Sequence, residues 1–149
     1  MQSASPRYQA AMLREIKPGS ADFQRFEGAL VEAGLPIDDL TSEPFIYFTA
    51  EGLAWGGVGM DADALLRSIV VAPEARQRGL GALITEGIAA HACDVGVQRL
   101  WLLTTDAMSF FEKLGWRAVD RKFAPETIAR SRQFSGLCPS SATLMTRAL

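Results

Sequence analysis

The most constraining feature of this chain is a mostly apolar run that ends in a segment rich in arginine and glycine. Residues 65–71 are rich in β-branched side chains, which is typical of a strand buried on both faces, and Pro73 ends further strand pairing. After Gly81 apolar residues recur every three or four positions, which indicates a helix. The sequence therefore predicts a strand, a turn with the spacing Arg-x-x-Gly-x-Gly, and a helix that begins in or just after that turn.

A helix that starts at this turn offers a site for an anion. Its first backbone N–H groups lack partners within the helix, and the helix dipole places partial positive charge there. Gly79 and Gly81 have no Cβ, so a phosphate can approach the backbone, and Arg76 and Arg78 add attraction. A plain helix cap with two solvated arginines accounts for the motif by itself about equally well.

Composition limits the classes of protein that fit. A length of 149 residues with 48% hydrophobic content suits one domain, and we expect residues 1–10 to be a flexible leader to a domain of residues 11–149. The net charge of −2 argues against nucleic acid or a membrane surface as a partner. No apolar stretch is long enough to span a bilayer and no signal peptide is evident, so we expect a cytoplasmic protein. Cys93 and Cys138 have no metal-ligand spacing, so we expect buried structural thiols and no metal.

Periodicity and turn residues predict an α/β (α+β) fold with a mixed sheet. Ser20 or Asp22 can cap the first helix, and Thr105 or Asp106 can cap a later helix that Gly115 ends. The glycines of the third strand leave room for close packing against its backbone. The predicted strands are 12–16, 45–50, 53–60, 65–71, 99–104, 116–121 and 142–146, and the predicted helices follow residues 20, 36, 79 and 105, with a short one at 125–134 in a segment that could form a substrate lid.

Two segments together resemble a known family. Arg76-Gln77-Arg78-Gly79-Leu80-Gly81 after a buried strand, and Phe110-Phe111-Glu112-Lys113-Leu114-Gly115-Trp116 much later, are similar to the GNAT superfamily of N-acetyltransferases over roughly residues 11–149. The resemblance implies a mostly antiparallel central sheet with splayed central strands and flanking helices. It also implies acetyl-CoA as co-substrate, with its pyrophosphate on the loop, its pantetheine arm on the preceding strand, and its thioester carbonyl on the backbone N–H of Ile69, Val70 or Val71. The implied cofactor-binding residues are Ile69, Val71, Arg76, Gln77, Arg78, Gly79, Leu80, Gly81, Ala82, Thr104 and Phe111.

The chain departs from the family at the residue that protonates the leaving thiolate. Many members place a tyrosine where this chain has Phe111, which has no exchangeable proton. Water, Ser109, Thr104 or Thr105 could replace it, or the thiolate could leave unassisted. The region that faces the acceptor in this family holds Asp38, Asp39 and Glu43, any of which could act as the base, or could simply be a solvated helix start. We interpret His91, the single histidine, as a helix-packing residue.

Further segments resemble the GNAT branch linked to arsenic resistance operons. They are residues 35–40, 102–105, 110–111 and 134–142. The resemblance implies acetylation of the α-amino group of a small, amino-acid-like arsenical. Arg130 or Arg132 could then hold a substrate carboxylate or an arsenate-like oxyanion, and Cys138 could bind trivalent arsenic. Solvated arginines and an unpaired buried thiol are the plain alternatives.

The sequence thus predicts an acetyl-CoA-dependent N-acetyltransferase that acts by direct attack of a small-molecule amine, as a monomer or homodimer. No acyl-enzyme is expected, because neither cysteine lies next to a histidine. The alternative is a non-catalytic acyl-CoA-binding or metalloid-sensing module on the same fold, which the missing tyrosine suggests. A Rossmann-type nucleotide binder fits poorly, since no G-x-G-x-x-G follows the first strand.

Overall fold

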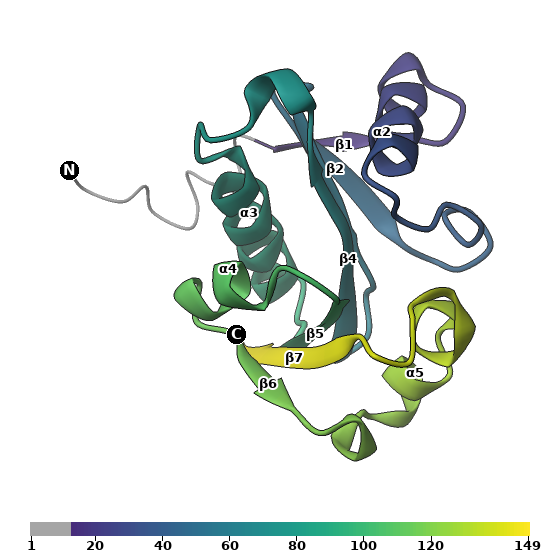
Figure 1. Ribbon diagram of the computed structural model, residues 1–149, viewed down its shortest axis with the longest axis vertical. Helices are drawn as coiled ribbons and strands as arrows, with labels where there is room; N and C mark the ends of the chain where they lie inside the picture. Colours follow the sequence, from purple (N-terminus) through teal and green to yellow (C-terminus); the bar gives the residue numbers. More distant parts are fainter. Residues whose placement is uncertain (1–12) are drawn as a thin grey trace.

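An open sheet forms the centre of the computed structural model, which describes residues 13–149 (Figure 1). Within those residues the sheet has seven strands in the order β1-β2-β3-β4-β5-β7-β6. All neighbouring pairs are antiparallel except β4 and β5, which α3 connects as a parallel pair. The predicted mixed, mostly antiparallel fold is therefore confirmed. The strands are β1 Leu13–Ile16, β2 Ile46–Ala50, β3 Ala54–Val58, β4 Asp63–Val71, β5 Arg99–Thr104, β6 Arg117–Val119 and β7 Thr143–Ala148.

Helices cover both faces of the sheet. Figure 1 shows α3 and α4 on one face and α2 and α5 on the other. The predicted leader and Met12 lie outside the described residues. None of the helices within residues 13–149 is long and apolar enough to cross a membrane. The α-helices are α2 Ala21–Glu32, α3 Leu80–Asp94, α4 Met108–Lys113 and α5 Glu126–Ala129, and the shorter turns are η1 Pro73–Ala75, η2 Arg121–Phe123 and the π-helical η3 Gln133–Leu137.

Helix α2 follows the predicted pattern closely. Ser20 caps it, with its hydroxyl accepting a hydrogen bond from the backbone N–H of Phe23 at 3.1 Å. Phe23, Phe26 and Leu30 form the buried stripe that packs on the sheet. Asp22, the other predicted cap, lies in the first turn instead.

The β2–β3 hairpin turns at Glu51 and Gly52, as predicted, and both residues have positive φ. The space beside the β3 glycines is taken up by this chain's own side chains. A Cβ on Gly56 would clash with Ile69, and one on Gly57 would lie 2.5 Å from the ring of Tyr47. These glycines therefore serve close internal packing.

The segment predicted to form a short helix at 36–40 forms turns instead. Two contacts of its buried residues explain the difference. The Asp39 carboxylate is paired with Arg67 of β4, and the backbone carbonyl of Leu40 accepts a hydrogen bond of 2.7 Å from the Tyr47 hydroxyl. Burial raises the pKa of Tyr47 well above its ordinary value, so this hydroxyl stays protonated and donates. Tertiary contacts thus override the local helix signal at Pro36.

Three further differences from the sequence prediction lie within residues 104–137. The N-cap residue of helix α4 is Ala107, so neither Thr105 nor Asp106 is the cap, and no side chain caps the helix. Thr104 Oγ1 instead accepts from the Ala107 N–H at 3.0 Å in the turn before the helix. Strand β6 ends at Val119, because Asp120 caps the turn η2. The single helix expected at 125–134 is instead the one-turn α5 followed by η3.

A second apolar cluster attaches the late segment, residues 120–142 between β6 and β7, to the sheet. Ile128 of α5 packs with Leu65, Trp101 and Leu144, which come from β4, β5 and β7. The segment between β6 and β7 is therefore anchored by its own buried contacts and is not a loose loop. Trp101 belongs to this cluster, and Trp55 and Trp116 belong to the main core.

Candidate active site

Strands β4 and β5 pair for only three residues and then separate. Asp63, Ala64 and Leu65 lie opposite Arg99, Leu100 and Trp101, and no further rung joins the two strands. Beyond that point β4 stays paired with β3 as far as Val71, and β5 stays paired with β7 as far as Thr104. The Trp101 indole N–H donates to Asp63 Oδ1 at 2.9 Å beside the last rungs. The two halves of the sheet therefore form a V that opens after Leu65.

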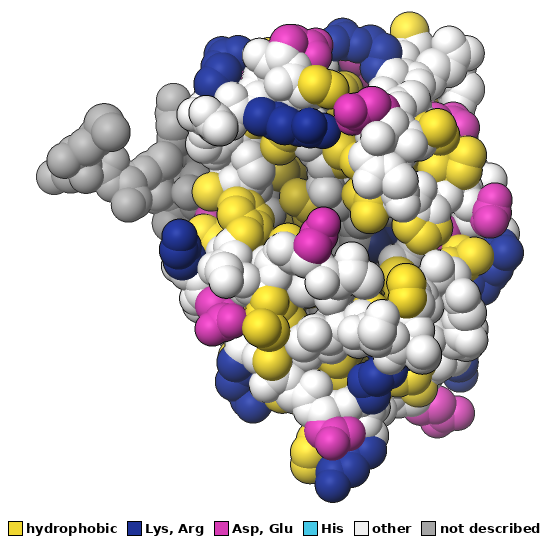
Figure 2. Space-filling model, in the orientation of Figure 1, with side chains coloured by type: hydrophobic (Ala, Val, Ile, Leu, Met, Phe, Trp, Pro, Cys, Tyr) yellow, Lys and Arg dark blue, Asp and Glu magenta, His cyan; other side chains and the backbone are white. Residues whose placement is uncertain are grey.

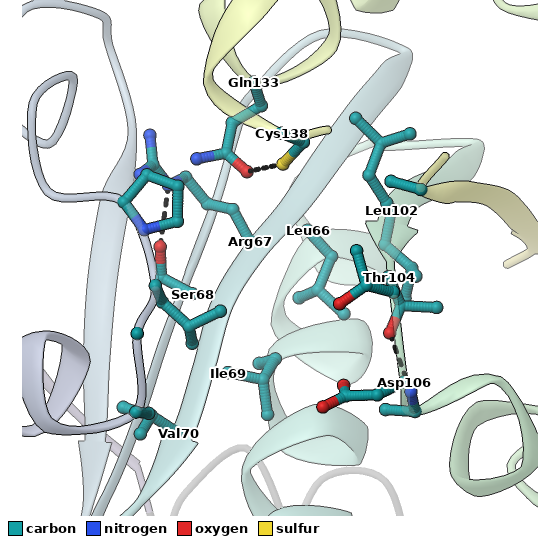
Figure 3. Close-up of a pocket in the computed structure, with 18 of the residues that line it drawn as sticks. Leu66, Arg67, Ser68, Ile69, Val70, Leu102, Thr104, Asp106, Gln133 and Cys138 are labelled. Carbon is teal, nitrogen blue, oxygen red and sulfur yellow. Dashed lines mark hydrogen bonds between the residues drawn. The ribbon is translucent and has the colours of Figure 1, made fainter. Parts of the chain in front are cut away.

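The V holds a cavity of about 780 Å³. Figure 2 shows a recess near the middle of this face, and Figure 3 shows side chains of both strands turned toward it. A cavity of this size is typical of small-molecule sites. On the side of the sheet strands and α4, its walls are residues 66–71 of β4, 102–104 of β5, 105–107 in the turn after β5, and Phe110 and Phe111. The other walls are residues 33–36 after α2, Arg76, Gly81, and Gln133, Leu137, Cys138, Pro139 and Ala142 of the late segment.

A β-bulge shapes the β4 wall. The register between β3 and β4 shifts between Trp55 and Gly57, and Ser68 has a φ of 59°. Left-handed backbone costs a residue with a Cβ about 1–2 kcal/mol. Such strain is often found at functional sites. Here the bulge bends β4 and turns Ser68 into the cavity wall.

Backbone direction decides which β4 amides face the opening. The Ala72 N–H donates to Leu53 O at 2.7 Å, toward β3. Amide direction alternates along an antiparallel strand, so the Val70 N–H also faces β3, whereas those of Ile69 and Val71 face the open side. Of the three predicted donors to a thioester carbonyl, Ile69 and Val71 therefore have their amides on the open side of β4.

The start of α3 lies at the mouth of the V. Gly79 precedes the helix with a φ of 78°, and no side chain caps the first turn, so the amides of residues 80–82 are open to a ligand. A Cβ on Gly81 would lie 3.3 Å from the Phe110 ring and 3.7 Å from Val71 Cγ2. Gly81 thus joins the helix start to the cavity, and these amides fit the diphosphate of a coenzyme A.

The predicted cofactor residues fall into two groups. Ile69, Val71, Thr104 and Phe111 line the cavity together with Arg76 and Gly81. Gln77, Arg78, Gly79, Leu80 and Ala82 form the loop and the helix start beside it. The Arg76 guanidinium lies 3.1 Å from Glu32 Oε2, and both side chains are half exposed. An arriving phosphate can compete for Arg76, because exposed ion pairs are weak.

The residues considered as the acid that protonates the leaving thiolate differ in whether they line the cavity. Phe111 is buried against Trp116 and lines the cavity. Thr104 and Thr105 also line it, and the Thr104 hydroxyl, which accepts from Ala107 N, keeps its own proton free to donate. Ser109 is exposed on α4, away from the cavity walls.

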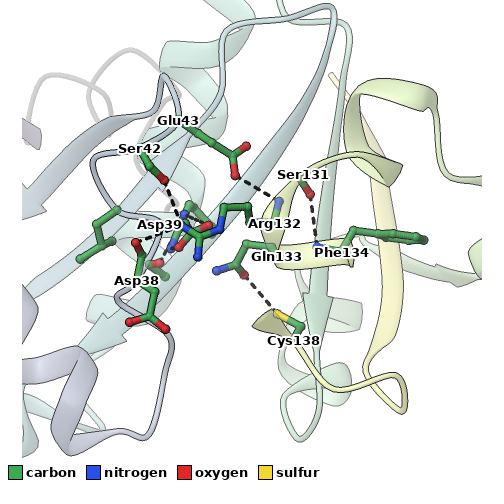
Figure 4. Close-up of polar contacts among 12 residues, drawn as sticks. Asp38, Asp39, Ser42, Glu43, Ser131, Arg132, Gln133, Phe134 and Cys138 are labelled. Carbon is green, nitrogen blue, oxygen red and sulfur yellow. Dashed lines mark hydrogen bonds and ion pairs between the residues drawn. The ribbon is translucent and has the colours of Figure 1, made fainter. Parts of the chain in front are cut away.

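The three predicted bases lie outside the cavity wall. Asp39 is fully buried, with Oδ1 2.7 Å and Oδ2 2.6 Å from the two terminal nitrogens of Arg67. The expectation that it is a solvated residue was wrong. Asp38 is exposed, and Glu43 accepts a hydrogen bond from the Arg132 backbone (Figure 4). Among the described residues Asp106 is the carboxylate that lines the cavity.

Neither predicted substrate arginine lines the cavity. The Arg132 guanidinium donates to the Asp38 carbonyl and to Ser42 Oγ, each at 3.2 Å, and so ties the late segment to the 38–43 turn (Figure 4). Arg130 is exposed. His91 packs against the ring of Phe48 at 4.8 Å between centroids, so its interpretation as a helix-packing residue is confirmed.

The two cysteines differ in environment. Cys138 lines the cavity, is half buried, and donates to Gln133 Oε1 at 3.2 Å. Burial raises the pKa of the Cys138 thiol, which disfavours the thiolate that a soft metal ion needs. Cys93 is exposed, so the expectation of a buried thiol was wrong there. Residues 13–149 contain no group of three or more acidic, cysteine or histidine side chains that could hold a metal ion.

This difference predicts unequal alkylation. At pH 8 we expect iodoacetamide to modify Cys93 at least about 10-fold faster than Cys138, because Cys93 is exposed, whereas Cys138 is half buried and burial raises the pKa of its thiol. CoA should slow Cys138 further and leave Cys93 unchanged. Peptide mapping by mass spectrometry measures both rates, and the two rates should converge in denaturant. Equal rates in the folded protein would contradict the structure.

The sequence analysis missed Arg67, Ser68, Asp106 and Gln133 as cavity residues. Arg67 did carry a signal, since a charged side chain within a buried strand needs a partner. The other three have no comparable signal, because their positions depend on the bulge and on the path of the late segment.

Comparisons with known proteins agree with this geometry. Residues 43–118, just over half of the chain, match the model of the acetyltransferase (GNAT) domain family. The chain belongs to the GNAT family. An uncharacterized N-acetyltransferase of Chlorobaculum tepidum is 31% identical to this GNAT protein over 67 residues, which are 45% of this chain and 43% of the relative. An amino-acid acetyltransferase of Salmonella arizonae is 34% identical over 59 residues, 40% of this chain and 13% of the relative. The match thus spans less than half the length of each of these relatives.

Solved structures share the GNAT fold over most of the described chain. N-acetylglutamate synthase from Neisseria gonorrhoeae, complexed with coenzyme A and N-acetyl-glutamate, has a TM-score of 0.71 at 18% identity and covers 92% of this chain and 35% of its own. An acetyltransferase from Streptococcus agalactiae has a TM-score of 0.69 at 16% identity, with coverages of 92% and 97%. A Mycobacterium tuberculosis protein in complex with CoA has a TM-score of 0.62 at 17% identity, with coverages of 92% and 98%. At these identities the likeness establishes the fold.

Proposed function

We propose that this GNAT protein is an acetyl-CoA-dependent N-acetyltransferase that acts on a small amine. The observation that carries the proposal is the V between β4 and β5, whose mouth adjoins the uncapped start of α3. A pantetheine arm fits the V, and a diphosphate fits the amides of the helix start. Acetyl-CoA supplies an activated acyl group, and the neutral amine attacks its carbonyl directly.

The chain's own groups can assist this reaction at three points. The N–H groups of Ile69 and Val71 face the open side of β4 and can donate to the carbonyl oxygen as it gains charge. The Thr104 hydroxyl has a free proton at the cavity wall and can donate to the departing thiolate in place of the missing tyrosine. Asp106 can take the ammonium proton, directly or through water.

For the acceptor we propose an amino-acid-like amine, with an arsenical amino acid as one candidate. The Salmonella relatives are amino-acid acetyltransferases, and the Neisseria structure contains N-acetyl-glutamate. A half-buried thiol, Cys138, lies in the cavity wall, where it can contact a soft substrate atom. We also propose that the protein works in the cytoplasm, because it would draw on acetyl-CoA.

Calorimetry with CoA and acetyl-CoA, followed by a free-thiol assay over a panel of amines, tests the proposal. We expect micromolar CoA binding, about −8 kcal/mol, and thiol release with at least one amino-acid-like amine, with the acetylated product identified by mass spectrometry. Binding without turnover of any amine would instead support the acyl-CoA-binding module, which the apolar Phe111 permits. In the same panel Cys138→Ser should retain turnover, whereas a metalloid sensor would lose its response.

A further inference from the structure

We propose that Gln133 and Ser68 together bind the carboxylate of the amino-acid acceptor, at the end of the cavity where η3 meets β4. The inference rests on the proposed acetyltransferase function and adds the residues that select the substrate. Neither side chain belongs to the helix start or to the amides assigned to acetyl-CoA. Figure 3 shows both residues at the same end of the cavity as Arg67.

Gln133 presents a buried donor without a partner. The residue is 6% exposed and lines the cavity, and Cys138 Sγ donates to its Oε1 at 3.2 Å. Its Nε2 has no hydrogen-bond partner among residues 13–149. A buried amide N–H left unpaired costs about 1–3 kcal/mol. Nε2 itself lies beneath the cavity surface, so a small rotation of the side-chain amide would bring it to a ligand oxygen and remove that cost.

Ser68 offers a second donor, which Arg67 strengthens. The Arg67 Nε donates to Ser68 Oγ at 2.9 Å, so the Ser68 hydroxyl proton is free to point elsewhere. A hydroxyl that accepts from a guanidinium becomes a better donor, because hydrogen bonds in a chain polarise one another. The strained φ of Ser68 holds this hydroxyl in the cavity wall.

The charges nearby favour a single carboxylate over a more highly charged group. Arg67 and Asp39 are both fully buried and neutralise each other. The Cys138 thiol remains protonated, so the described groups at this end present donors and no uncompensated negative charge. Arg67 stacks on the Phe45 ring, with its Cζ 4.9 Å from the centroid, which fixes the guanidinium behind Ser68. An amino acid bound here would be held by its carboxylate, with its amine free to face the V.

The test compares matched acceptors on the CoA-saturated protein. The probes are L-leucine, L-leucinamide and isoamylamine, and L-histidine, L-histidinamide and histamine, which keep the side chain and change only the carboxylate. We expect calorimetry to show the acid binding at least about 10-fold more tightly than the amide or the amine for one or both sets. Equal affinities within both sets would overturn the proposal, and a preference for the amide would assign the donors to a neutral carbonyl instead.

Two isosteric variants locate the site. Gln133→Glu keeps the oxygen that accepts from Cys138 and replaces the donor with a negative charge, so affinity for the acid should fall about 100-fold. Gln133→Met removes the donor without adding charge, which covers the case that Gln133→Glu does not fold, and should cost about 10-fold. Ser68→Ala should cost a similar factor. CoA affinity should stay unchanged in all three, and Ser135→Ala, an exposed change on the same turn, should match the parent.

The outcomes separate this inference from the function on which it rests. Tight binding of the acid with no acetyl transfer would leave the carboxylate site standing and overturn the enzyme proposal. Acetyl transfer at the same rate to the acid, the amide and the amine would support the enzyme proposal and overturn the carboxylate site. Unchanged affinity for the acid in both Gln133→Glu and Gln133→Met would show that Gln133 does not contact the carboxylate, which overturns the inference.

Discussion

Gly81→Asp is expected to weaken CoA binding at least about 100-fold while leaving the protein folded. The new carboxylate would stand in the first turn of α3, where the open amides and Val71 border the mouth of the V. Two like charges about 4 Å apart repel by roughly 4 kcal/mol at an effective dielectric constant of 20, and solvent screening leaves a part of that. An acidic residue near a helix N-terminus is otherwise favourable. A Cβ at Gly81 would lie 3.3 Å from the Phe110 ring, which needs to move by only a few tenths of an ångström, so we expect little loss of stability. Isothermal titration with CoA gives the affinity, and a urea titration gives the stability.

Gly28→Asp is the matched control for this variant. Gly28 lies on the exposed side of α2, and a Cβ there would meet no atom within 4 Å. The same change of residue and charge should therefore leave CoA affinity within about 2-fold of the parent, consistent with small surface effects. If Gly81→Asp also bound CoA normally, the start of α3 would not be the diphosphate site.

Asp39→Ala is expected to lower the free energy of unfolding by about 3–5 kcal/mol. It would leave the Arg67 guanidinium fully buried without its counter-charge. The same loss should free Arg67 from its present position and so disturb Ser68, to which Arg67 Nε donates. Urea denaturation followed by tryptophan fluorescence measures the effect, since Trp55, Trp101 and Trp116 are all buried.

Two comparisons identify the cause of that loss. Asp38→Ala, at the exposed neighbouring residue, should change stability by less than about 0.5 kcal/mol. Combining Asp39→Ala with Arg67→Met should recover much of the stability, because replacing both members of a buried pair with apolar groups is often nearly neutral. A double variant as unstable as Asp39→Ala alone would show that the pair is not the source of the effect.

The elements that the sequence predicts best are those whose signals are local. The Ser20 cap and the stripe of Phe23, Phe26 and Leu30 define α2 without reference to the rest of the chain. The turn at Gly79 and the start of α3 are equally local. The turn at 36–40 was predicted wrongly as a helix, because its conformation depends on Arg67, which lies 28 positions away from Asp39.

The candidate site divides along the same line. The proposed diphosphate loop is one continuous segment, so its residue spacing is sufficient to predict it. The proposed acceptor end of the cavity is assembled from β4, the 33–36 turn and the late segment, and its members come together only through tertiary contacts. Arg132 shows the difficulty. From the sequence it was a candidate anion-binding residue, but in the structure its guanidinium donates to the Asp38 carbonyl and to Ser42 Oγ.

The vertex of the V bears on how a ligand enters. Each arm is hydrogen-bonded along its length to an outer strand, β3 or β7, and the Trp101 contact with Asp63 braces the point at which the arms meet. A space framed in this way exists before anything occupies it. Ligand binding should therefore cost little backbone conformational entropy, and separation of the two strands need not limit the rate of binding.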